Sequence, residues 1–388
     1  MTLASDDTER LLADSAASFL ANQDCLARLR AARPGMPAYS PATWAELAAQ
    51  GWLALRLPEA LGGSGLGLRH ALCLTEAFGR RLLPEPYIGS ALMPAVLAQQ
   101  LPGAPAWVPV TRGLVDGQHR TSVAWQADPQ ALQPAFHGLH AEARGERLVL
   151  EGLRHGVVAA PFADCLLVSA SLEGAPALIL VGRDSPGLAS EDVDTSDGGS
   201  LSMLRFTGVA VPAAAVLARG EPVAQALSAA IAEATLATAA QLLGVASAAL
   251  DVTLDYLRIR VQFGQAIGSF QSLQHSAADV RIEQALARAA CQGALARHEA
   301  DAVSAATAAA IAAAKARASD AALLAGRFGV QAHGAIGFTT EADVGWYLKA
   351  ALRLAASLGN GSQQRRVYGA LTRAAQAAAQ AVAPGVSR

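Results

Sequence analysis

The hydrophobic period changes twice along this chain of 388 residues, and that change constrains the fold more than any single motif does. Apolar residues recur at helix spacing near both ends, whereas the middle contains short strand-like runs separated by Gly, Pro, Asp and Ser. The order predicts an α+β protein with a helical domain over residues 1–118, a β domain over 119–218 and a helical bundle over 219–388.

Local patterns place the elements within these three blocks. Asp6 and Glu9 are predicted to form a capping box at the start of the first helix. The predicted strands of the middle block include residues 147–150, 166–169, 177–181 and 204–207. The predicted long helices of the last block span residues 224–261, 270–300 and 302–328, and two shorter helices follow. Long helices with short connections are typical of an antiparallel bundle.

Composition argues against several classes of function. Charged residues make up only 16% and the formal net charge is -2, so no basic excess favours nucleic-acid binding. Hydrophobic residues make up 52%, but no apolar run reaches the ~18 to 20 residues of a membrane span. The four cysteines are far apart, with no CxxC pair and no zinc-like spacing. We therefore expect no metal site, and reduced, mostly buried thiols in a cytoplasmic protein.

A first candidate site is the segment Arg260-Val261-Gln262-Phe263-Gly264-Gln265-Ala266-Ile267-Gly268 at a predicted helix end. Gly264 suits the left-handed position that closes a helix. Arg260 and Phe263 are three residues apart and would share a helix face. An arginine and an aromatic ring there are suited to a diphosphate and a flat ring. The alternative is an ordinary helix hairpin with a solvent-facing arginine.

A second candidate site is the segment Gln331-Ala332-His333-Gly334-Ala335-Ile336-Gly337-Phe338, which follows a long helix. Its glycines allow a backbone to come close to a ligand. Backbone N–H groups and the Gln331 amide are suited to phosphate or adenine edges. Loops with this glycine spacing are common, so the segment alone is a weak signal.

Together the two segments read R-x-Q-F-G-x-x-I-x-x-F-Q and Q-x-H-G-x-I-G-x-T-x-E, and at this separation they resemble the acyl-CoA dehydrogenase family. The resemblance extends over nearly the whole chain, through Leu57-Pro58-Glu59 in the first block and Asp184-Ser185-Pro186-Gly187 in the middle block. It implies a helical N-terminal domain, a middle β-barrel or β-sandwich domain and a C-terminal four-helix bundle.

The resemblance also implies FAD as the cofactor, bound between the middle and C-terminal domains and across a dimer interface. By motif position, Arg260 would contact the FAD pyrophosphate of a neighbouring subunit. Phe263 and Gln271 would line the same site.

The adenosine end of FAD would meet Gln331 and Gly334, and Ala335 stands where the family usually has a second glycine. In the middle domain, Trp125 falls in the segment that resembles the family's flavin-contacting loop. It is predicted to stack beside the isoalloxazine, and the alternative is a tryptophan of the protein core.

The catalytic base is where the chain departs from the family pattern. Family members abstract an α-proton from an acyl thioester with a glutamate, which here falls on Gly359. Some members carry the base on the first long helix of the bundle, where the matching residue is Ala234 and the substrate-side arginine is replaced by Thr235. Glu233 is one residue away and is the remaining candidate for the base; a solvated helix-face charge is the alternative.

Two main interpretations follow from the resemblance. The chain is an α,β-dehydrogenase of acyl thioesters without the usual glutamate, or it is a catalytically silent subunit that completes the FAD site of a heteromeric dehydrogenase. A flavin oxidase or monooxygenase of the same fold, and a helical protein without cofactor, are further alternatives. The implied partners are an acyl-CoA or acyl carrier protein thioester, an electron-transferring flavoprotein and a homologous chain in a homo- or hetero-oligomer.

Overall fold

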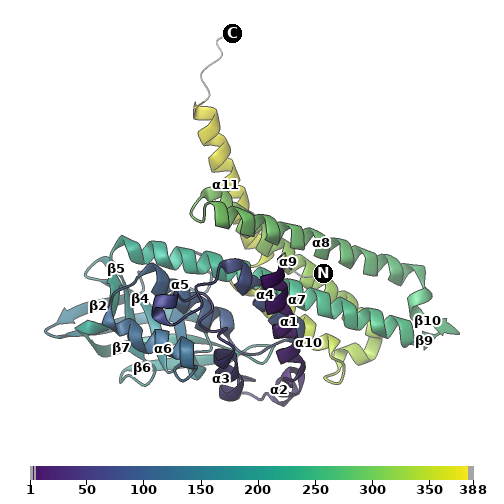
Figure 1. Cartoon of the computed structure of the whole chain (residues 1–388), viewed down its shortest axis with the longest axis horizontal. Helices are drawn as coiled ribbons and strands as arrows, with labels where there is room; N and C mark the ends of the chain where they lie inside the picture. The colour runs from purple at the N-terminus through teal and green to yellow at the C-terminus, as the bar shows by residue number, and fades with distance from the viewer. Residues whose placement is uncertain (1–2, 4–5, 383–388) are drawn as a thin grey trace, which may run out of the picture. The chain divides into compact units, whose positions relative to one another are not determined.

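The chain folds into two compact units, one mainly helical and one built on a sheet. The structure, a computed structural model, describes Leu3 and residues 6–382 (Figure 1). The bundle unit comprises the described residues of Met1–Gln23, Leu72–Leu82 and Thr235–Arg388. The sheet unit comprises Asp24–Ala71 and Leu83–Ala234. Each unit combines segments that are separate in sequence. The division therefore does not test the three consecutive domain ranges, which stay predictions.

Long helices make up the bundle unit, and two of them, α4 and α7, begin in residues of the sheet unit. They are α1 (Asp7–Ala21), α4 (Leu68–Arg81), α7 (Glu221–Ile259), α8 (Gln271–Ala300), α9 (Ala305–His333), α10 (Val344–Ala356) and α11 (Gly361–Val382). At the start of α1, the Asp6 carboxylate accepts a hydrogen bond of 2.8 Å from the Glu9 N–H, as the predicted cap requires.

Glycines let α4 and α7 approach each other closely. A Cβ atom on Gly79 of α4 would lie 2.0 Å from the main-chain carbonyl oxygen of Gln241. A Cβ atom on Gly244 of α7 would lie 2.0 Å from the main-chain carbonyl oxygen of Glu76. Any side chain at either position would therefore force the two helix backbones apart. The contact therefore fixes the spacing between α4 and α7.

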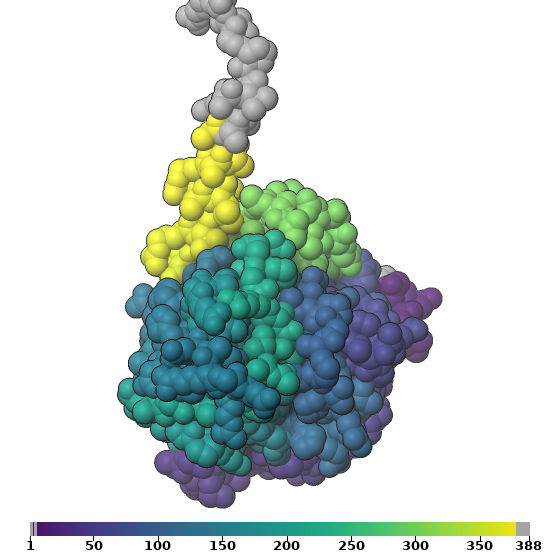
Figure 2. Space-filling model, turned by 90° about the vertical axis from the view of Figure 1, so that its left-hand side faces the viewer, coloured from purple at the N-terminus to yellow at the C-terminus, as the bar shows by residue number. Residues whose placement is uncertain are grey.

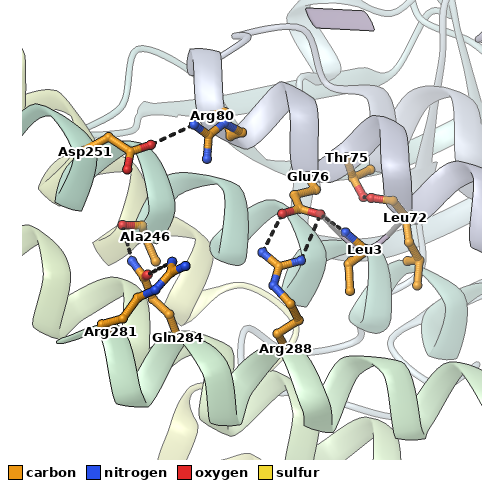
Figure 3. Close-up of polar contacts among 10 residues, drawn as sticks. All are labelled: Leu3, Leu72, Thr75, Glu76, Arg80, Ala246, Asp251, Arg281, Gln284 and Arg288. Carbon is orange, nitrogen blue, oxygen red and sulfur yellow. Dashed lines mark hydrogen bonds and ion pairs between the residues drawn. The ribbon is translucent and has the colours of Figure 1, made fainter. Parts of the chain in front are cut away.

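A buried ion pair joins α4 to α8 in the same unit (Figure 3). The Arg288 guanidinium donates to both Glu76 oxygens, at 2.7 and 3.3 Å, and the Leu3 N–H donates to Glu76 Oε2 at 2.7 Å. Gln284, one turn earlier on α8, donates to the Ala246 carbonyl at 2.7 Å. The buried face of α8 is thus partly polar, and each polar group drawn on it is hydrogen-bonded, as burial requires.

The last helix, α11, packs against α9 near its start, and its later turns rise clear of the other helices of the unit (Figures 1 and 2). A capping box begins it: the Asn360 and Gln363 side chains each accept a hydrogen bond of 2.9 Å from the other residue's N–H. Residues 373–377 are exposed.

Short helices and eight strands make up the sheet unit. The helices are α2 (Cys25–Ala31), α3 (Pro41–Ala49), α5 (Met93–Gln100) and α6 (Val108–Asp116). The strands are β1 (Thr121–Ala124), β2 (Leu139–Arg144), β3 (Arg147–Val158), β4 (Cys165–Leu172), β5 (Ala175–Gly182), β6 (Leu188–Asp194), β7 (Ser200–Pro212) and β8 (Val216–Arg219).

The eight strands form one sheet in the order β6-β7-β3-β2-β4-β5-β8, and β1 also pairs with β4. Both β1 and β2 run parallel to β4, along its first and last residues respectively, and the other pairs are antiparallel. Leu150, Leu166, Ile179 and Phe206 are fully buried in the sheet core. The four strand-like runs predicted from the sequence all lie in strands, and the predicted α+β class is confirmed.

One predicted element is wrong in detail. The helix expected to run to Val261 ends at Ile259, and Gly264 does not close it, because residues 261–266 form a separate two-stranded hairpin.

The prediction that no stretch is long and apolar enough to span a membrane also needs correction. In the part of the chain that the structure describes, α7 is the one helix long and apolar enough to cross a membrane, and 83% of its most apolar window is buried inside the protein. A buried core helix of a protein that crosses no membrane can have the same length and composition. This single helix is therefore weak evidence for a membrane span.

Candidate functional site

The first motif forms the turn between α7 and α8. Strands β9 (Val261–Gln262) and β10 (Gln265–Ala266) pair antiparallel across Phe263 and Gly264. Both turn residues are left-handed, with φ of 54° and 80°, as a type I′ hairpin turn requires. Arg260 and Phe263 therefore do not share a helix face. They lie instead at the base and the tip of this hairpin.

Arg260 is available to bind an anion. Its backbone is held in place by two hydrogen bonds. Its N–H donates to the main-chain carbonyl of Tyr256 at 2.9 Å, and its carbonyl accepts from the Ile267 N–H at 2.8 Å. Its side chain is exposed and makes no hydrogen bond or ion pair with any described residue. Phe263 is 89% exposed and its ring meets Phe270 edge-on, with 6.1 Å between the ring centroids.

The second motif lies at the same end of the bundle unit. The His333 ring, at the end of α9, stacks on Tyr256 of α7 with 4.1 Å between the centroids. The His333 Nδ1 and the Gly329 carbonyl are 2.7 Å apart. Since Tyr256 is one turn before Arg260, this stack brings the ends of both motifs together.

The residues predicted to meet FAD at this end are accessible. Gln331, Gly334, Ala335 and, at the start of α8, Gln271 are all exposed. Gly334 has φ of 67°, and no atom lies within 4 Å of the position its Cβ would take. This end of the bundle unit therefore presents accessible backbone at Gly334, the unpaired guanidinium of Arg260 and the exposed ring of Phe263. These groups fit a dinucleotide's phosphates and flat rings, and their roles stay predictions.

Trp125, the remaining predicted flavin contact, lies in the sheet unit and is only 5% exposed. Its carbonyl accepts a hydrogen bond from Ser169 Oγ at 3.4 Å. The same hydroxyl accepts from the Arg154 Nε at 3.1 Å. Hydrogen bonds within the sheet unit therefore hold the backbone of Trp125. The part of Trp125 in a flavin site stays a prediction.

Arg154 is a buried cation with no carboxylate partner among the residues that the structure describes, and its burial was not predicted from the sequence. Its guanidinium is fully buried and donates to main-chain carbonyls, among them His137 at 3.0 Å and Ser169 at 2.9 Å. Burial lowers the pKa of Arg154 to about 10. Its bonds reach the carbonyls of residues 135–137, so it fixes the loop that follows Trp125.

Glu233, the candidate base, is held in a buried ion pair. Arg56 donates to it twice, from Nε at 3.0 Å and from Nη2 at 2.7 Å, and the two side chains are only 11% and 6% exposed. Neighbouring Tyr87 is fully enclosed, and burial raises the pKa of its hydroxyl. Both Glu233 oxygens thus accept from a cation, and moving Arg56 away would leave a buried carboxylate without its counter-charge. Its catalytic role stays a prediction.

The position of the usual glutamate lies in the turn between α10 and α11. Gly359 has φ of 88° and is buried. Its carbonyl accepts a hydrogen bond of 3.1 Å from Lys315 of α9. At the other position used within the family, Ala234 is fully buried in α7. Neither position carries a group that can accept a proton.

One hollow lies away from these residues. A half-open hollow of about 340 Å³ lies between α9 and α11, and its lining contains none of the predicted site residues. Among the described residues no three His, Cys, Asp or Glu side chains are grouped to hold a metal ion. None of the described cysteines forms a disulfide, and Cys25, Cys73 and Cys291 are buried.

Comparison with known proteins identifies the family. Residues 6–98 match the family description "Acyl-CoA dehydrogenase, N-terminal domain", and residues 223–371 match "Acyl-CoA dehydrogenase, C-terminal domain". The acyl-CoA dehydrogenase IpdE2 of Mycobacterium tuberculosis is 30% identical over 348 residues, which are 89% of this chain and 91% of that protein.

Solved structures agree with this match. The ChsE4-ChsE5 complex from Mycobacterium tuberculosis contains a chain with a TM-score of 0.81 and 26% identity, covering 96% of this chain and 99% of that one. A variant of the Tcur3481-Tcur3483 steroid ACAD has a TM-score of 0.83 and 30% identity, with the same coverage of both chains. The fold, the two motifs and these matches together show that the chain belongs to the acyl-CoA dehydrogenase family.

Proposed function

We propose that this chain is a subunit of an FAD-dependent acyl-CoA dehydrogenase, and that it completes a flavin site without supplying the usual glutamate. Membership of the family supports an oxidoreductase that acts on an acyl-CoA. The bound flavin would supply the hydride acceptor for the α,β-dehydrogenation. Arg260, Phe263 and Gln271 would hold its central part, and Gln331, Gly334 and Ala335 its adenosine end.

One observation carries the second half of this proposal. Gly359 has no side chain, its backbone is left-handed, and its carbonyl is already bonded to Lys315. A glutamate at this position would have to adopt a conformation that costs ~1 to 2 kcal/mol. The turn is therefore built for glycine, and a proton acceptor for the reaction has to come from elsewhere.

Glu233 is the second candidate for that acceptor within this chain. It lies one residue from the position used by some family members, but both its oxygens are bonded to Arg56. As the base, it would need the arriving thioester to displace this guanidinium. We favour a homologous chain as the source of the base, because the ion pair occupies the carboxylate.

The partners follow from the same proposal. The substrate would be an acyl-CoA or acyl carrier protein thioester, and the electrons would pass to an electron-transferring flavoprotein. The names of the similar structures include a steroid ACAD and a complex of two different chains. We therefore propose a hetero-oligomer with a homologous chain, a bulky cyclic acyl group as the first substrate to test, and a cytoplasmic location.

An anaerobic titration tests the proposal. The purified chain, alone and mixed with any co-encoded homologous chain, is titrated with a panel of acyl-CoA thioesters while the flavin band near ~450 nm is followed. We expect bleaching by a matching thioester only in the mixture. Bleaching by the chain alone would show that it carries its own base. Absence of a flavin band in both samples after FAD addition would contradict the cofactor assignment.

A separate reaction in the presence of oxygen tests the oxidase and monooxygenase alternatives. An oxidase would form the enoyl product while reducing oxygen to hydrogen peroxide, whereas a monooxygenase would consume oxygen and add one oxygen atom to the product. Mass spectrometry of the product identifies a monooxygenase, since dehydrogenation removes two hydrogens from the acyl group and adds no oxygen. Hydrogen peroxide formation separates an oxidase from a dehydrogenase, because the two give the same enoyl product.

A further inference from the structure

Lysine is rare in this chain, and one of its lysines is fully buried. Of the 30 Lys and Arg residues only Lys315 and Lys349 are lysines. Lys349 lies on α10, with its ammonium 3.9 Å from the centre of the Trp346 ring. Lys315 lies on α9 with no exposed surface. A sequence that uses arginine nearly everywhere else therefore has an ammonium at this buried position.

Every hydrogen bond of this ammonium goes to a neutral oxygen. It donates to Ser319 Oγ at 3.2 Å, to the Ala355 carbonyl at 3.2 Å and to the Gly359 carbonyl at 3.1 Å. An ammonium has three N–H donors, so these three acceptors satisfy all of them. Arginine presents its donors in a planar fork and would not reach three oxygens arranged around one atom.

The burial of Lys315 is costly. Desolvation, and after it the nearby Arg353 guanidinium on α10, together lower its pKa to about 7. A methionine or leucine would fill the space without this cost. The ammonium at this position therefore has to be explained by what it bonds.

Two of its three acceptors lie at the turn between α10 and α11, one just before it and one within it. The Ala355 carbonyl belongs to the last turn of α10, and the Gly359 carbonyl belongs to the turn itself. Within the turn, Leu358 and Gly359 are both left-handed, with φ of 52° and 88°. A leucine in this region of φ is strained. The turn thus needs bonds from outside its own backbone.

Gln364 of α11 provides one further bond, since its Nε2 donates to the Leu358 carbonyl at 2.6 Å. The carbonyls of two consecutive left-handed residues are therefore each held by a side chain, one from α9 and one from α11. Of these two bonds, the one from α9 ties the turn to a helix that is distant in sequence, whereas α11 follows the turn directly.

We propose that Lys315 is a positioning residue that sets the conformation of the α10–α11 turn, and through it the place of Gly359 in the flavin-enzyme site. That this turn belongs to a reaction site rests on the function proposed above. The clamp itself concerns only α9, α10 and α11. It is therefore tested without flavin or substrate, so its failure is distinguishable from failure of the proposed function.

The test is residue-resolved amide hydrogen exchange on the full chain, comparing the wild type with Lys315→Met. The turn amides to follow are Ser357, which donates to the Arg353 carbonyl at 3.0 Å, and Asn360, which donates to Gln363 Oε1 at 2.9 Å. Ala321 and Ala322, fully buried in α9, serve as the internal reference. Lys349→Met, at the chain's other lysine, is the matched control variant.

We expect the Ser357 and Asn360 amides of Lys315→Met to exchange at least roughly tenfold faster, with the reference amides and the control variant near wild type. Unchanged exchange in the turn would overturn the proposal. Equal acceleration of turn and reference amides would also overturn it, because that result indicates loss of global stability only. If Lys315→Met does not fold, Lys315→Gln, which keeps two N–H donors on a shorter side chain, is judged by the same two criteria.

Discussion

Arg260 is the residue whose availability most favours an anionic ligand. Its backbone is fixed at the end of α7, yet its guanidinium bonds no described residue. Surface arginines elsewhere in the chain are commonly paired; Arg258, two residues away, is 2.6 Å from Asp255. A positioned but unpaired guanidinium is suited to bind a phosphate that arrives with a ligand or a partner.

We predict that Arg260→Ala weakens FAD binding by about 10- to 150-fold, because a charge-assisted bond to phosphate contributes ~1.5 to 3 kcal/mol. The measurement is the dissociation constant of FAD, by flavin fluorescence, in the assembly that binds it. Arg258→Ala is the control and should change it little, since its exposed pair contributes ~0.2 to 1 kcal/mol. Equal retention of flavin by both variants would rule out Arg260 as the phosphate ligand.

Glu233 raises the opposite question, because its carboxylate is fully engaged. We predict that Glu233→Gln lowers the free energy of unfolding by ~1 to 3 kcal/mol, since it leaves Arg56 buried without its counter-charge. Urea unfolding measures this. Flavin bleaching by a matching acyl-CoA in the complete assembly should persist in this variant. Loss of bleaching with an intact fold would establish Glu233 as the base.

At the scale of single elements, the α4–α7 contact depends on two glycines that sequence periodicity treats as weak points of a helix. We predict that Gly79→Ala lowers the free energy of unfolding by ~1 to 3 kcal/mol or more, because its Cβ would meet the Gln241 oxygen at 2.0 Å. Gly293→Ala on α8 is the matched control. No atom lies within 4 Å of its Cβ position, so it should stabilise by ~0.5 to 1 kcal/mol.

Chemical denaturation of both variants decides the point. The two substitutions are identical in chemistry and both fall inside helices, so opposite signs would isolate the close backbone approach as the cause. A stabilised Gly79→Ala would mean that α4 and α7 do not pack as closely as described.

The α9 helix also gives stability a pH dependence. The pKa of Lys315 is about 7 in the folded chain and 10.5 for a free lysine, so the unfolded chain binds this proton more tightly. The free energy of unfolding should therefore rise with pH between about 7 and 10.5, by up to ~1.4 kcal/mol per pH unit, and this contribution is flat below 7. Lys315→Met should lack that rise when unfolding is compared at pH 7 and pH 9.

Much of the element map was predictable because long helices and buried strands carry strong periodic signals. The start of α8 and the four strand runs lie where the sequence predicted them. The β9–β10 hairpin was not predicted, because an arginine-to-phenylalanine spacing of three looks helical when the strands are two residues long. The Asn360–Gln363 capping box was not predicted, although an asparagine followed three residues later by a glutamine is its local sequence signal.

At the scale of the whole molecule, the ion pairs that join distant segments within each unit could not be predicted. Glu76 and Arg288 are 212 positions apart in sequence, and Arg56 and Glu233 are 177 apart, so no local pattern connects them. Buried cations such as Arg154 and Lys315 look like ordinary surface charges until their acceptors, which are main-chain carbonyls, are known. The two motifs that resemble the family's FAD-binding segments were recognisable, because each is contiguous in sequence.

Phe263 combines two features that are unfavourable in an isolated chain. Its ring is 89% exposed, and its φ of 54° lies at a turn position that favours asparagine or glycine. A strained, exposed aromatic residue suggests a contact outside the described chain, with flavin or a homologous subunit. The local cost and the benefit then belong to different states of the molecule, so one substitution can separate them.

We predict that Phe263→Asn raises the free energy of unfolding of the isolated chain by ~1 kcal/mol, because asparagine tolerates the left-handed conformation. The same variant should bind FAD, or its homologous chain, at least roughly tenfold more weakly, since the ring no longer packs there. Urea unfolding measures the first effect, and flavin fluorescence with light scattering measures the second. Val303→Asn, at a position 92% exposed between α8 and α9, should change neither. A Phe263→Asn chain that is more stable and still assembles with flavin normally would mean that the ring serves neither contact.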